Sequence, residues 1–244
     1  MKKGSIRIGT SGWHYKHWKG TFYPSNVKEK DQLATFIQHF DTVEINNSFY
    51  RIPKEETFET WKKSVPGNFL FSVKANRYFT HLKKLNVSKN AIEDFLNKAS
   101  LLEEKLGVIL FQLPPGWKCD HNRLSSFLHQ LPKGFRYTFE FRNATWDNED
   151  TYSLLKQYNC AYCIYNLAGH LSPIKTTADF VYIRLHGPGG KYEGSYSDAE
   201  LENWAKLVKQ WSMDGKDVYV YFDNDQLGYA GFNAETLIQK IGKD

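Results

Sequence analysis

The chain has 244 residues, a formal net charge of +5, 41% hydrophobic residues and three cysteines. A chain of this length can bury a sizeable core, and three cysteines exclude a disulfide-stabilised scaffold. No apolar run approaches the roughly 20 residues that a membrane span needs. The N-terminal residues also lack the apolar segment of a secretory signal. We therefore expect a cytoplasmic protein without a membrane partner.

Short β-rich segments alternate with helical patterns along the chain. The predicted strands are Ile6–Thr10, Thr42–Asn46, Phe69–Lys74, Val108–Gln112, Arg136–Phe141, Ala161–Tyr165, Phe180–Leu185 and Val218–Phe222. This alternation predicts a parallel sheet with crossover helices. Because there are eight such strands, we expect one domain over residues 1–244, a distorted TIM-like (β/α)8 barrel of the α/β class. An open doubly wound sheet is the alternative.

Two of the expected helices carry clear boundary signals. Lys89–Leu106 has one apolar face and lies between Ser88, a predicted N-cap, and Gly107, a predicted stop. Ser197 and Glu200 have the spacing of a capping box, which predicts that a second helix begins there.

Weaker signals concern two further helices and one connection. Asp147 and Asn233 are plausible N-caps. The segment Asn166–Asp179 contains Gly, Pro and two Thr residues but no amphipathic repeat. We therefore expect an irregular sixth crossover, which would distort the barrel there.

A Cys-x-x-Cys motif, Cys160 to Cys163, lies in a predicted strand. A spacing of three places the two thiols on opposite faces of a strand. A redox motif needs a helix N-terminus and a zinc site needs a second cysteine pair, so we interpret both cysteines as structural.

Polar residues occupy one face of several predicted strands near their C-terminal ends. Side chains alternate across a strand, and the apolar set should pack against the helices. The polar set that then faces the barrel axis is Glu44, Asn46, Ser72, Lys74, Asn76, Thr138, Glu140, Arg142, Tyr182, Arg184 and His186, and Gln112 lies at the end of the fourth strand. Active sites of TIM barrels lie at this end of the strands. The alternative is a structural network of ion pairs, such as Glu44 with Arg184, because buried charges must be paired.

Roles follow from residue type and position. The expected catalytic residues are Glu44, Glu140, His186 and Lys74. The expected substrate-binding residues are Trp13, Asn46, Tyr50, Gln112, Arg142, Trp146, Arg184, Gly187, Gly189, Asp223 and Asn224. The aromatic residues would stack on a sugar or base. The turn from Gly187 to Gly190 would hold phosphate, because it follows the seventh strand of the barrel.

Ordered motifs from about Ile6 to about Leu237 resemble those of one family. They include Gly9-Thr10-Ser11-Gly12-Trp13, Val43-Glu44-Ile45-Asn46-Asn47-Ser48-Phe49-Tyr50, Phe111-Gln112-Leu113-Pro114-Pro115, Glu140-Phe141-Arg142, Tyr182-Ile183-Arg184-Leu185-His186-Gly187 and Tyr221-Phe222-Asp223-Asn224. This set resembles the YecE-like family, a domain of unknown function. The resemblance implies a distorted (β/α)8 barrel and no particular reaction. Asp223 departs from the Asn expected there. More loosely, the fold is similar to the endonuclease IV and xylose isomerase barrels, by fold-level analogy alone.

Five functional hypotheses remain open. The first is an enzyme that binds an anionic, phosphorylated or sugar-like substrate and uses carboxylate acid–base chemistry. The second is an endonuclease IV-like barrel that binds or processes DNA. The third adds a divalent metal held by Glu44, Glu140, His186 and Asp223, although nearby cations disfavour it and we expect no cofactor. The fourth makes Lys74 a Schiff-base nucleophile. The last is a binding or scaffold barrel without catalysis.

Overall fold

A computed structural model describes residues 2–242, which divide into two compact units. Unit 1 contains the described residues up to Glu44, the segment Ile164–Ile174, and the described residues from Asp179 onward. Unit 2 contains Ile45–Cys163 and Lys175–Ala178. The expectation of one domain over the whole chain stays a prediction.

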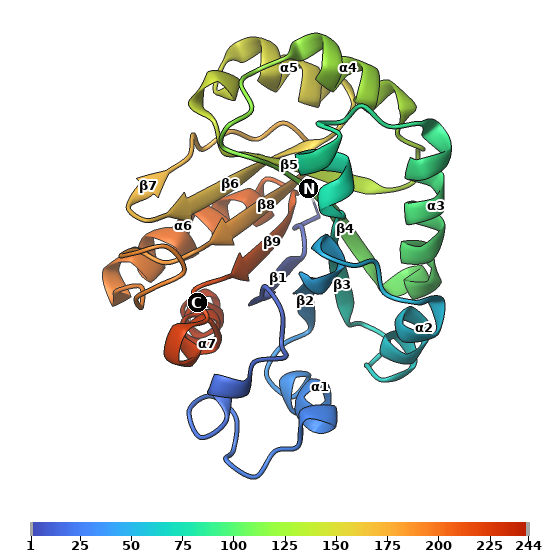
Figure 1. The fold of residues 1–244 in the computed structure, drawn as a ribbon. Helices are drawn as coiled ribbons and strands as arrows, with labels where there is room; N and C mark the ends of the chain where they lie inside the picture. The colour runs from blue at the N-terminus through green and yellow to red at the C-terminus, as the bar shows by residue number, and fades with distance from the viewer. Residues whose placement is uncertain (1, 243–244) are drawn as a thin grey trace. The chain divides into compact units, whose positions relative to one another are not determined.

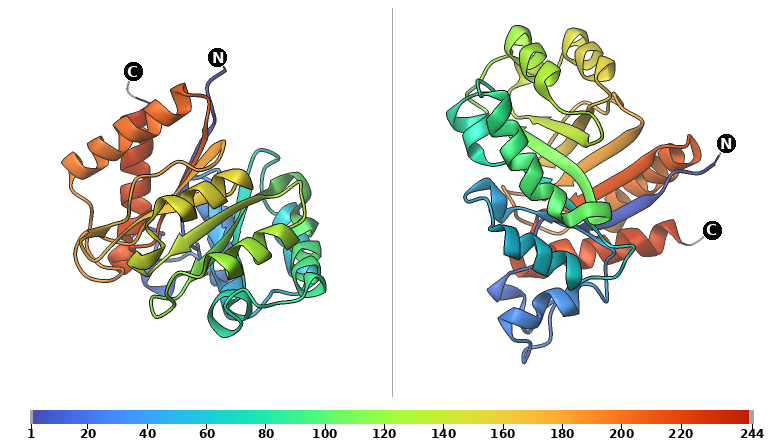
Figure 2. Two further views of the ribbon diagram at one scale, coloured as in Figure 1. Left: turned by 90° about the horizontal axis from the view of Figure 1, so that it is seen from above. Right: turned by 90° about the vertical axis from the view of Figure 1, so that its right-hand side faces the viewer.

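Unit 1 is built on parallel strands with two long helices against them. Its strand order is β1-β9-β8-β6, and the short β7 pairs antiparallel with β6. The strands are β1 (Ile6–Thr10), β6 (Ala161–Leu167, shared with unit 2), β7 (His170–Leu171), β8 (Phe180–Leu185) and β9 (Asp217–Phe222). The helices are α1 (Gln32–Phe36), α6 (Asp198–Met213) and α7 (Tyr229–Ile241), with single turns η1 (Lys16–Trp18), η2 (Glu29–Asp31) and η7 (Gln226–Gly228). Helices α6 and α7 lie side by side and pack on β9 (Figures 1 and 2).

Unit 2 continues the strand order as β6-β5-β4-β3-β2. Its strands are β3 (Leu70–Lys74), β4 (Leu106–Leu113) and β5 (Arg136–Phe141), together with the last residue of β2 (Thr42–Ile45), whose other residues belong to unit 1. Its helices are α2 (Glu55–Lys63), α3 (Lys89–Ala99), α4 (His121–Gln130) and α5 (Glu149–Gln157), with short turns η3 (Asn47–Phe49), η4 (Tyr78–Leu82), η5 (Ser100–Lys105) and η6 (Ala144–Trp146). The four helices follow one another along the outside of these strands (Figure 1).

Eight strands in parallel order with helical crossovers confirm the predicted fold class, a distorted TIM-like (β/α)8 barrel. Within unit 1 an isolated parallel bridge joins Ser11, just after β1, to Glu44 of β2. Strands β1 and β2 are the first and last in the order, so this bridge links the two ends of the sheet, as a barrel requires.

Two helix starts agree with the sequence signals. The Ser88 hydroxyl accepts the Ala91 amide at 3.3 Å. The capping box of α6 is complete, with Ser197 accepting from the Glu200 amide at 3.3 Å and Glu200 accepting from the Ser197 amide at 2.8 Å. These bonds satisfy amides that the first helical turn leaves without a partner.

The predicted helix Lys89–Leu106 is too long. The α-helix ends at Ala99 and continues as a 3-10 segment, in which Glu103 adopts a positive φ of 51°. Strand β4 then begins at Leu106, so Gly107 lies in a strand and does not stop the helix. The apolar residues from Ile92 to Leu102 on the predicted face are buried, so their spacing resembles one continuous helix although the last of them lies in the 3-10 segment.

Both weaker N-cap predictions were wrong. Asn148 caps α5 by accepting the Thr151 amide at 3.0 Å, whereas Asp147 accepts from the Tyr162 hydroxyl at 2.6 Å. Asn233 lies inside α7 and is buried. Its Oδ1 accepts hydrogen bonds from the Tyr196 backbone amide and from the Asn224 side chain. Gly228 precedes that helix instead.

The expected irregular crossover at Asn166–Asp179 is confirmed. It contains the hairpin of β6 with β7 and no helix. Within residues 2–242 we find no helix long and apolar enough to cross a bilayer.

Candidate functional site

The inward face of unit 1 carries hydroxyl and charged side chains in place of an aliphatic filling. Tyr182 and Arg184 of β8 are in register with Tyr219 and Tyr221 of β9, so all four project from one face. The Tyr182 hydroxyl donates to Glu44 at 2.7 Å, which places Glu44 on that face as the alternation predicts. TIM-barrel interiors are normally filled by Val, Ile and Leu, so this face is unusually polar.

Arg184 is the centre of this cluster and is completely buried. Its Nε lies 2.9 Å from Glu44 Oε2, and its terminal Nη2 lies 2.7 Å from Glu44 Oε1 and 3.0 Å from Asp223 Oδ2. The same nitrogen donates to the Ser11 hydroxyl at 3.1 Å, and Ser11 in turn donates to Glu44. Glu44 and Arg184 therefore form the bidentate ion pair that the structural alternative proposed.

His186 extends the cluster beyond Arg184. Arg184 Nη1 lies 3.3 Å from His186 Nε2, and His186 Nδ1 lies 2.9 Å from Asp223 Oδ2. A guanidinium N–H can only donate, so His186 Nε2 is the acceptor in its contact with Arg184. The imidazole is thus oriented by two charged partners, an arrangement suited to proton transfer.

Carboxylates dominate the electrostatics of the unit 1 cluster. Burial, followed by Asp223 and Asp225, raises the pKa of the Tyr15 hydroxyl well above its ordinary value. Burial and then the charge of Asp223 raise the pKa of Asp225 as well. The hydroxyl of Tyr15, kept protonated, donates to the Ser11 carbonyl. Anionic groups thus outweigh the Arg184 guanidinium here.

The glycine-rich turn after β8 is engaged within unit 1. Gly187 has a φ of +109°, and a Cβ there would lie 2.2 Å from the Glu193 carbonyl oxygen, so only glycine fits. Its amide donates to the Tyr196 hydroxyl at 3.0 Å. Gly189 has more room, because its nearest neighbour, the Glu193 carbonyl oxygen, is 3.8 Å from a Cβ position. The Gly187 amide is therefore committed to the fold.

Asn224 is also bonded within the fold. It is completely buried, and its Nδ2 donates to the Gly194 carbonyl at 2.8 Å and to Asn233 Oδ1 at 2.9 Å.

Unit 2 presents a second polar face. Lys74 is in register with Leu110, Leu110 with Thr138, and Gln112 with Glu140. Registered residues of parallel strands project to the same side, so Lys74, Gln112 and Glu140 share one face. Glu140 is completely buried and pairs with the Arg142 guanidinium. The Gln112 amide donates to the Leu113 carbonyl at 2.9 Å.

The loops after β2 and β3 pack together at the end of this face. Asn76 donates to the Ser48 carbonyl at 2.9 Å. The Phe49 ring lies 5.0 Å from the His81 ring, edge to face, and the Lys74 ammonium lies 4.4 Å from the Phe49 ring centre. Half-buried Asn46 begins the first loop. The second loop contains a π-helical turn, Tyr78–Leu82, a conformation frequent at functional sites.

Cations dominate these two loops. No Asp or Glu occurs between residues 46 and 54 or between residues 74 and 92. Burial, followed by Lys74 and then Arg77, lowers the pKa of His81 from 6.5. Exposed Arg51, Lys83 and Lys84 lie in the same loops. We call the set Arg51, Lys74, Arg77, Lys83 and Lys84, with Tyr50 and Tyr78, the basic loop surface.

The predicted aromatic residues have three different environments. Tyr50 is 74% exposed and can receive a ligand ring. Trp146 is completely buried, stacks on Phe141 at 4.7 Å and donates to the Trp117 carbonyl at 3.0 Å. Trp13 is 8% exposed. Trp146 is therefore a core residue, and its predicted stacking role has no accessible ring face to support it.

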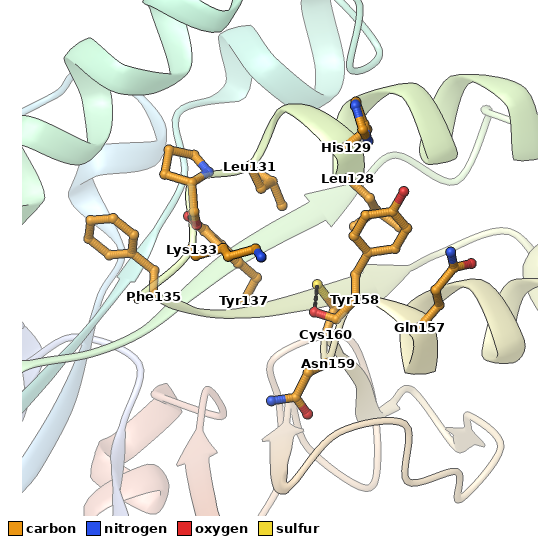
Figure 3. Close-up of a pocket in the computed structure, with 12 residues that line it drawn as sticks. Leu128, His129, Leu131, Lys133, Phe135, Tyr137, Gln157, Tyr158, Asn159 and Cys160 are labelled. Atoms are coloured by element: carbon orange, nitrogen blue, oxygen red, sulfur yellow. Dashed lines mark hydrogen bonds between the residues drawn. The ribbon is translucent and has the colours of Figure 1, made fainter.

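A cavity of about 570 Å³ lies at the other end of β5 and β6 (Figure 3). Phe135 and Tyr137 from the start of β5, Tyr158 and Cys160 from the start of β6, and Leu131 after α4 contribute to its wall. Burial raises the pKa of the Cys160 thiol to about 12. None of the predicted site residues lines it, and TIM-barrel sites lie at the opposite strand ends.

Sequence reasoning missed several members of these clusters. Ser11 and Tyr15 follow β1, and a hydroxyl directly after a barrel strand was an available signal for Ser11. His81 lies in a loop whose lack of acidic residues is visible in the sequence. Within residues 2–242, no three His, Cys, Asp or Glu side chains are grouped so that they could hold a metal ion.

Comparison with known proteins identifies the family. The family model described as "Protein of unknown function DUF72" matches residues 7–244. The chain is 27% identical to UPF0759 protein YunF of Bacillus subtilis, over 97% of this chain and 94% of that protein. It is 28% identical to UPF0759 protein YecE of Escherichia coli K12, over 57% of this chain and 48% of that one.

Solved structures give the same result. The crystal structure of a DUF72 family protein from Thermotoga maritima superposes with a TM-score of 0.88 at 28% identity, covering 98% of this chain and all of the other. One from Enterococcus faecalis gives 0.82 at 22% identity, covering 98% of this chain and 96% of the other, which shows the fold. The chain belongs to the YecE-like DUF72 family, whose fold is a TIM-like barrel and whose function is unknown.

Proposed function

We propose that the protein binds a phosphate-bearing small molecule on the basic loop surface of unit 2. The observation that carries this proposal is a set of cations in loops without a carboxylate, where burial and then the charges of Lys74 and Arg77 lower the pKa of His81. Grouped cations repel one another, so an anion that joins them removes that repulsion. Arginine and lysine are the side chains that phosphate sites use most.

The same surface supplies a stacking partner. Tyr50 is 74% exposed and Tyr78 is 39% exposed, next to Arg51 and Arg77. A sugar or base ring attached to the phosphate can stack on such a ring for about 1–3 kcal/mol. We therefore favour a sugar phosphate or nucleotide over inorganic phosphate.

Acid–base chemistry on that ligand would fall to Glu140. It shares the inward face of unit 2 with Lys74, and Arg142 holds its carboxylate. Unit 1 contains a second candidate set, in which Glu44, Arg184, Asp223 and His186 orient one another. This assignment makes the protein a carboxylate enzyme without a cofactor, located in the cytoplasm, where its three free cysteines stay reduced.

Calorimetric titration with inorganic phosphate, glucose 6-phosphate and AMP tests the binding. We expect the ring-bearing phosphates to bind more tightly than phosphate alone, and Lys74→Met to weaken each by about tenfold, a loss of about 1.4 kcal/mol. Lys156→Met, at an exposed lysine on α5 of the same unit, is the matched control. If no phosphate compound binds, or both variants behave alike, the proposal is wrong.

A nucleic-acid ligand is the second candidate, favoured by exposed Tyr50 beside Arg51. A strand that contacts several phosphates loses about 10³-fold or more in affinity between 50 and 200 mM salt. A nucleotide with one phosphate group loses far less. Titration of a twelve-nucleotide single strand and of AMP at both salt concentrations therefore separates the two candidates. Binding of neither ligand would exclude both candidates.

A further inference from the structure

Cys119 and His121 form a close pair in unit 2 that the proposed function does not use. Cys119 precedes Asp120, the N-cap of α4, and His121 is the first residue of that helix. The Cys119 sulfur lies 3.2 Å from His121 Nε2. Both side chains are only half-buried, so solvent and small solutes reach them. A thiol in contact with an imidazole is the arrangement by which cysteine nucleophiles are activated.

The start of α5 surrounds the same sulfur. Asn148, the N-cap of α5, points its Nδ2 at the sulfur from 3.9 Å, and the Thr151 hydroxyl lies at the same distance. Thr151 also lies 3.0 Å from His121 Nε2, which fixes the imidazole over the thiol. Partial positive charge at a helix N-terminus stabilises a thiolate. Cys119 is thus next to a base and next to two helix starts.

Neighbouring carboxylates are largely engaged elsewhere. Asp120 accepts the Arg123 amide at 2.9 Å as the cap of α4. Glu149, in the first turn of α5, pairs with Lys175 at 2.9 Å. Asp150 follows Glu149 and is exposed, and Lys118 precedes Cys119. The titratable group in direct contact with the sulfur is therefore the His121 imidazole.

The other two cysteines lack these features. Cys160 is buried and donates weakly to the Tyr158 carbonyl at 3.6 Å, and its thiol is difficult to ionise because burial raises its pKa to about 12. Cys163 is completely buried and points its thiol toward Glu140 at 3.9 Å, a negative neighbour that opposes a thiolate. Both cysteines of the Cys-x-x-Cys motif are therefore less accessible than Cys119.

We propose that Cys119 is a reversible thiol-modification site that reacts with small disulfides, with His121 as the base that activates it. The thiol proton moves to His121 Nε2 as the sulfur attacks one sulfur atom of the disulfide. The Cys119–sulfur bond forms, the disulfide bond breaks and the second half leaves as a thiolate, while His121 releases the thiol proton to solvent. Cys119 is oxidised to a mixed disulfide while the other half of the reagent is reduced, so electrons balance, and excess thiol reverses the step.

The test uses 5,5′-dithiobis(2-nitrobenzoate), whose released thiolate is followed by absorbance, on the folded full chain at pH 7. We expect one fast equivalent per chain, absent in Cys119→Ser and retained in Cys160→Ala. His121→Gln should slow that phase by about tenfold or more. His129→Gln, at an exposed histidine near the other end of α4, should leave it unchanged.

Chemical rescue separates activation from a purely structural contact. In His121→Ala we expect added imidazole to restore much of the rate, while urea unfolding confirms that the variant is folded. The proposal is overturned if the fast phase persists in Cys119→Ser. It is equally overturned if His121→Gln reacts like the wild type, or if imidazole has no more effect on His121→Ala than on His129→Gln.

Discussion

The two polar clusters of this barrel differ in the sign of their charge and in how fully that charge is paired. In unit 1, Arg184 is enclosed by Glu44, Asp223 and Ser11, and burial followed by carboxylate charge raises the pKa of neighbouring Tyr15 and Asp225. In unit 2, burial followed by the charges of Lys74 and Arg77 lowers the pKa of His81. Within residues 2–242, no ion pair involves Arg51, Arg77 or Lys84.

This difference distinguishes a cluster that stabilises the fold from a surface that can bind a ligand. A buried guanidinium whose three nitrogens all have partners within the protein braces the fold, and a ligand would have to displace those partners. By contrast, an exposed cation that takes part in no ion pair can bind an anion without first giving up a partner within the protein. Residue type and position predict substrate binding for Arg184, whereas its buried partners Glu44 and Asp223 indicate a role in bracing the fold.

The largest effect should come from breaking the unit 1 network. Arg184→Met leaves Glu44 and Asp223 buried without their cation, which typically costs about 3–5 kcal/mol. We expect urea unfolding to show a loss of that size, with Lys83→Met in the basic loop surface nearly neutral. Equal, small losses in both variants would mean that the network does not brace unit 1.

The next effect concerns ligand binding in unit 2. Arg77→Ala should weaken AMP binding by about tenfold, because one charge-assisted contact is lost, a difference of about 1.4 kcal/mol. Urea unfolding should change little. Calorimetry that finds unaltered affinity, or a stability loss as large as that of Arg184→Met, would remove the contrast between the two clusters.

The pKa values of His81 and Asp225 report the local electrostatic potential in the two clusters. In Lys74→Met the pKa of His81 should rise toward 6.5, because one of the repelling cations is gone. In Asp223→Asn the pKa of Asp225 should fall toward 3.8, because its nearest negative neighbour is gone. NMR titration of each side chain follows the change, and a shift in the opposite direction in either variant would reverse the assigned potential.

The smallest effect is the pH dependence of stability. Because folding lowers the pKa of His81, the unfolded chain binds its proton more readily. The contribution of His81 is thus present above pH 6.5 and is lost as the pH falls through its lowered pKa. Asp225, with a raised pKa, contributes in the opposite sense, so that its stabilisation disappears as the pH rises through that value. Urea unfolding between pH 4 and 8 should show a shallower acid limb in His81→Gln than in the wild type.

Much of the fold follows from local patterns. Strand alternation placed Glu44, Tyr182 and Arg184 on one face, and their hydrogen bonds agree. The capping box at Ser197 marked the start of α6 because its two bonds are local. The N-cap prediction for Asn233 failed because the sequence does not distinguish an asparagine that caps a helix from one whose side chain anchors a distant loop.

The functional clusters were predicted less well, because they depend on contacts between distant segments. No local pattern shows that Asp223 shares Arg184 with Glu44, or that Trp146 stacks on Phe141 in the core. The Cys119 and His121 pair was also overlooked, although two residues that flank an N-cap are an available local signal. The Cys-x-x-Cys spacing drew attention to the two cysteines that are buried.

The anchoring of the loop after β8 has a consequence for how this chain can vary. Gly187 fixes the start of the loop through Tyr196, and Asn224 and Asn233 fix its end at Gly194 and Ser195. The intervening tip, residues 189–191, lies between these anchored segments, because Tyr192 packs against the His186 ring and the Glu193 carbonyl lies against Gly187. Extra residues inserted at the tip would therefore extend into solvent without moving either anchor. The tip is the place where a different sequence could be introduced while β8, β9 and the Arg184 network keep their geometry.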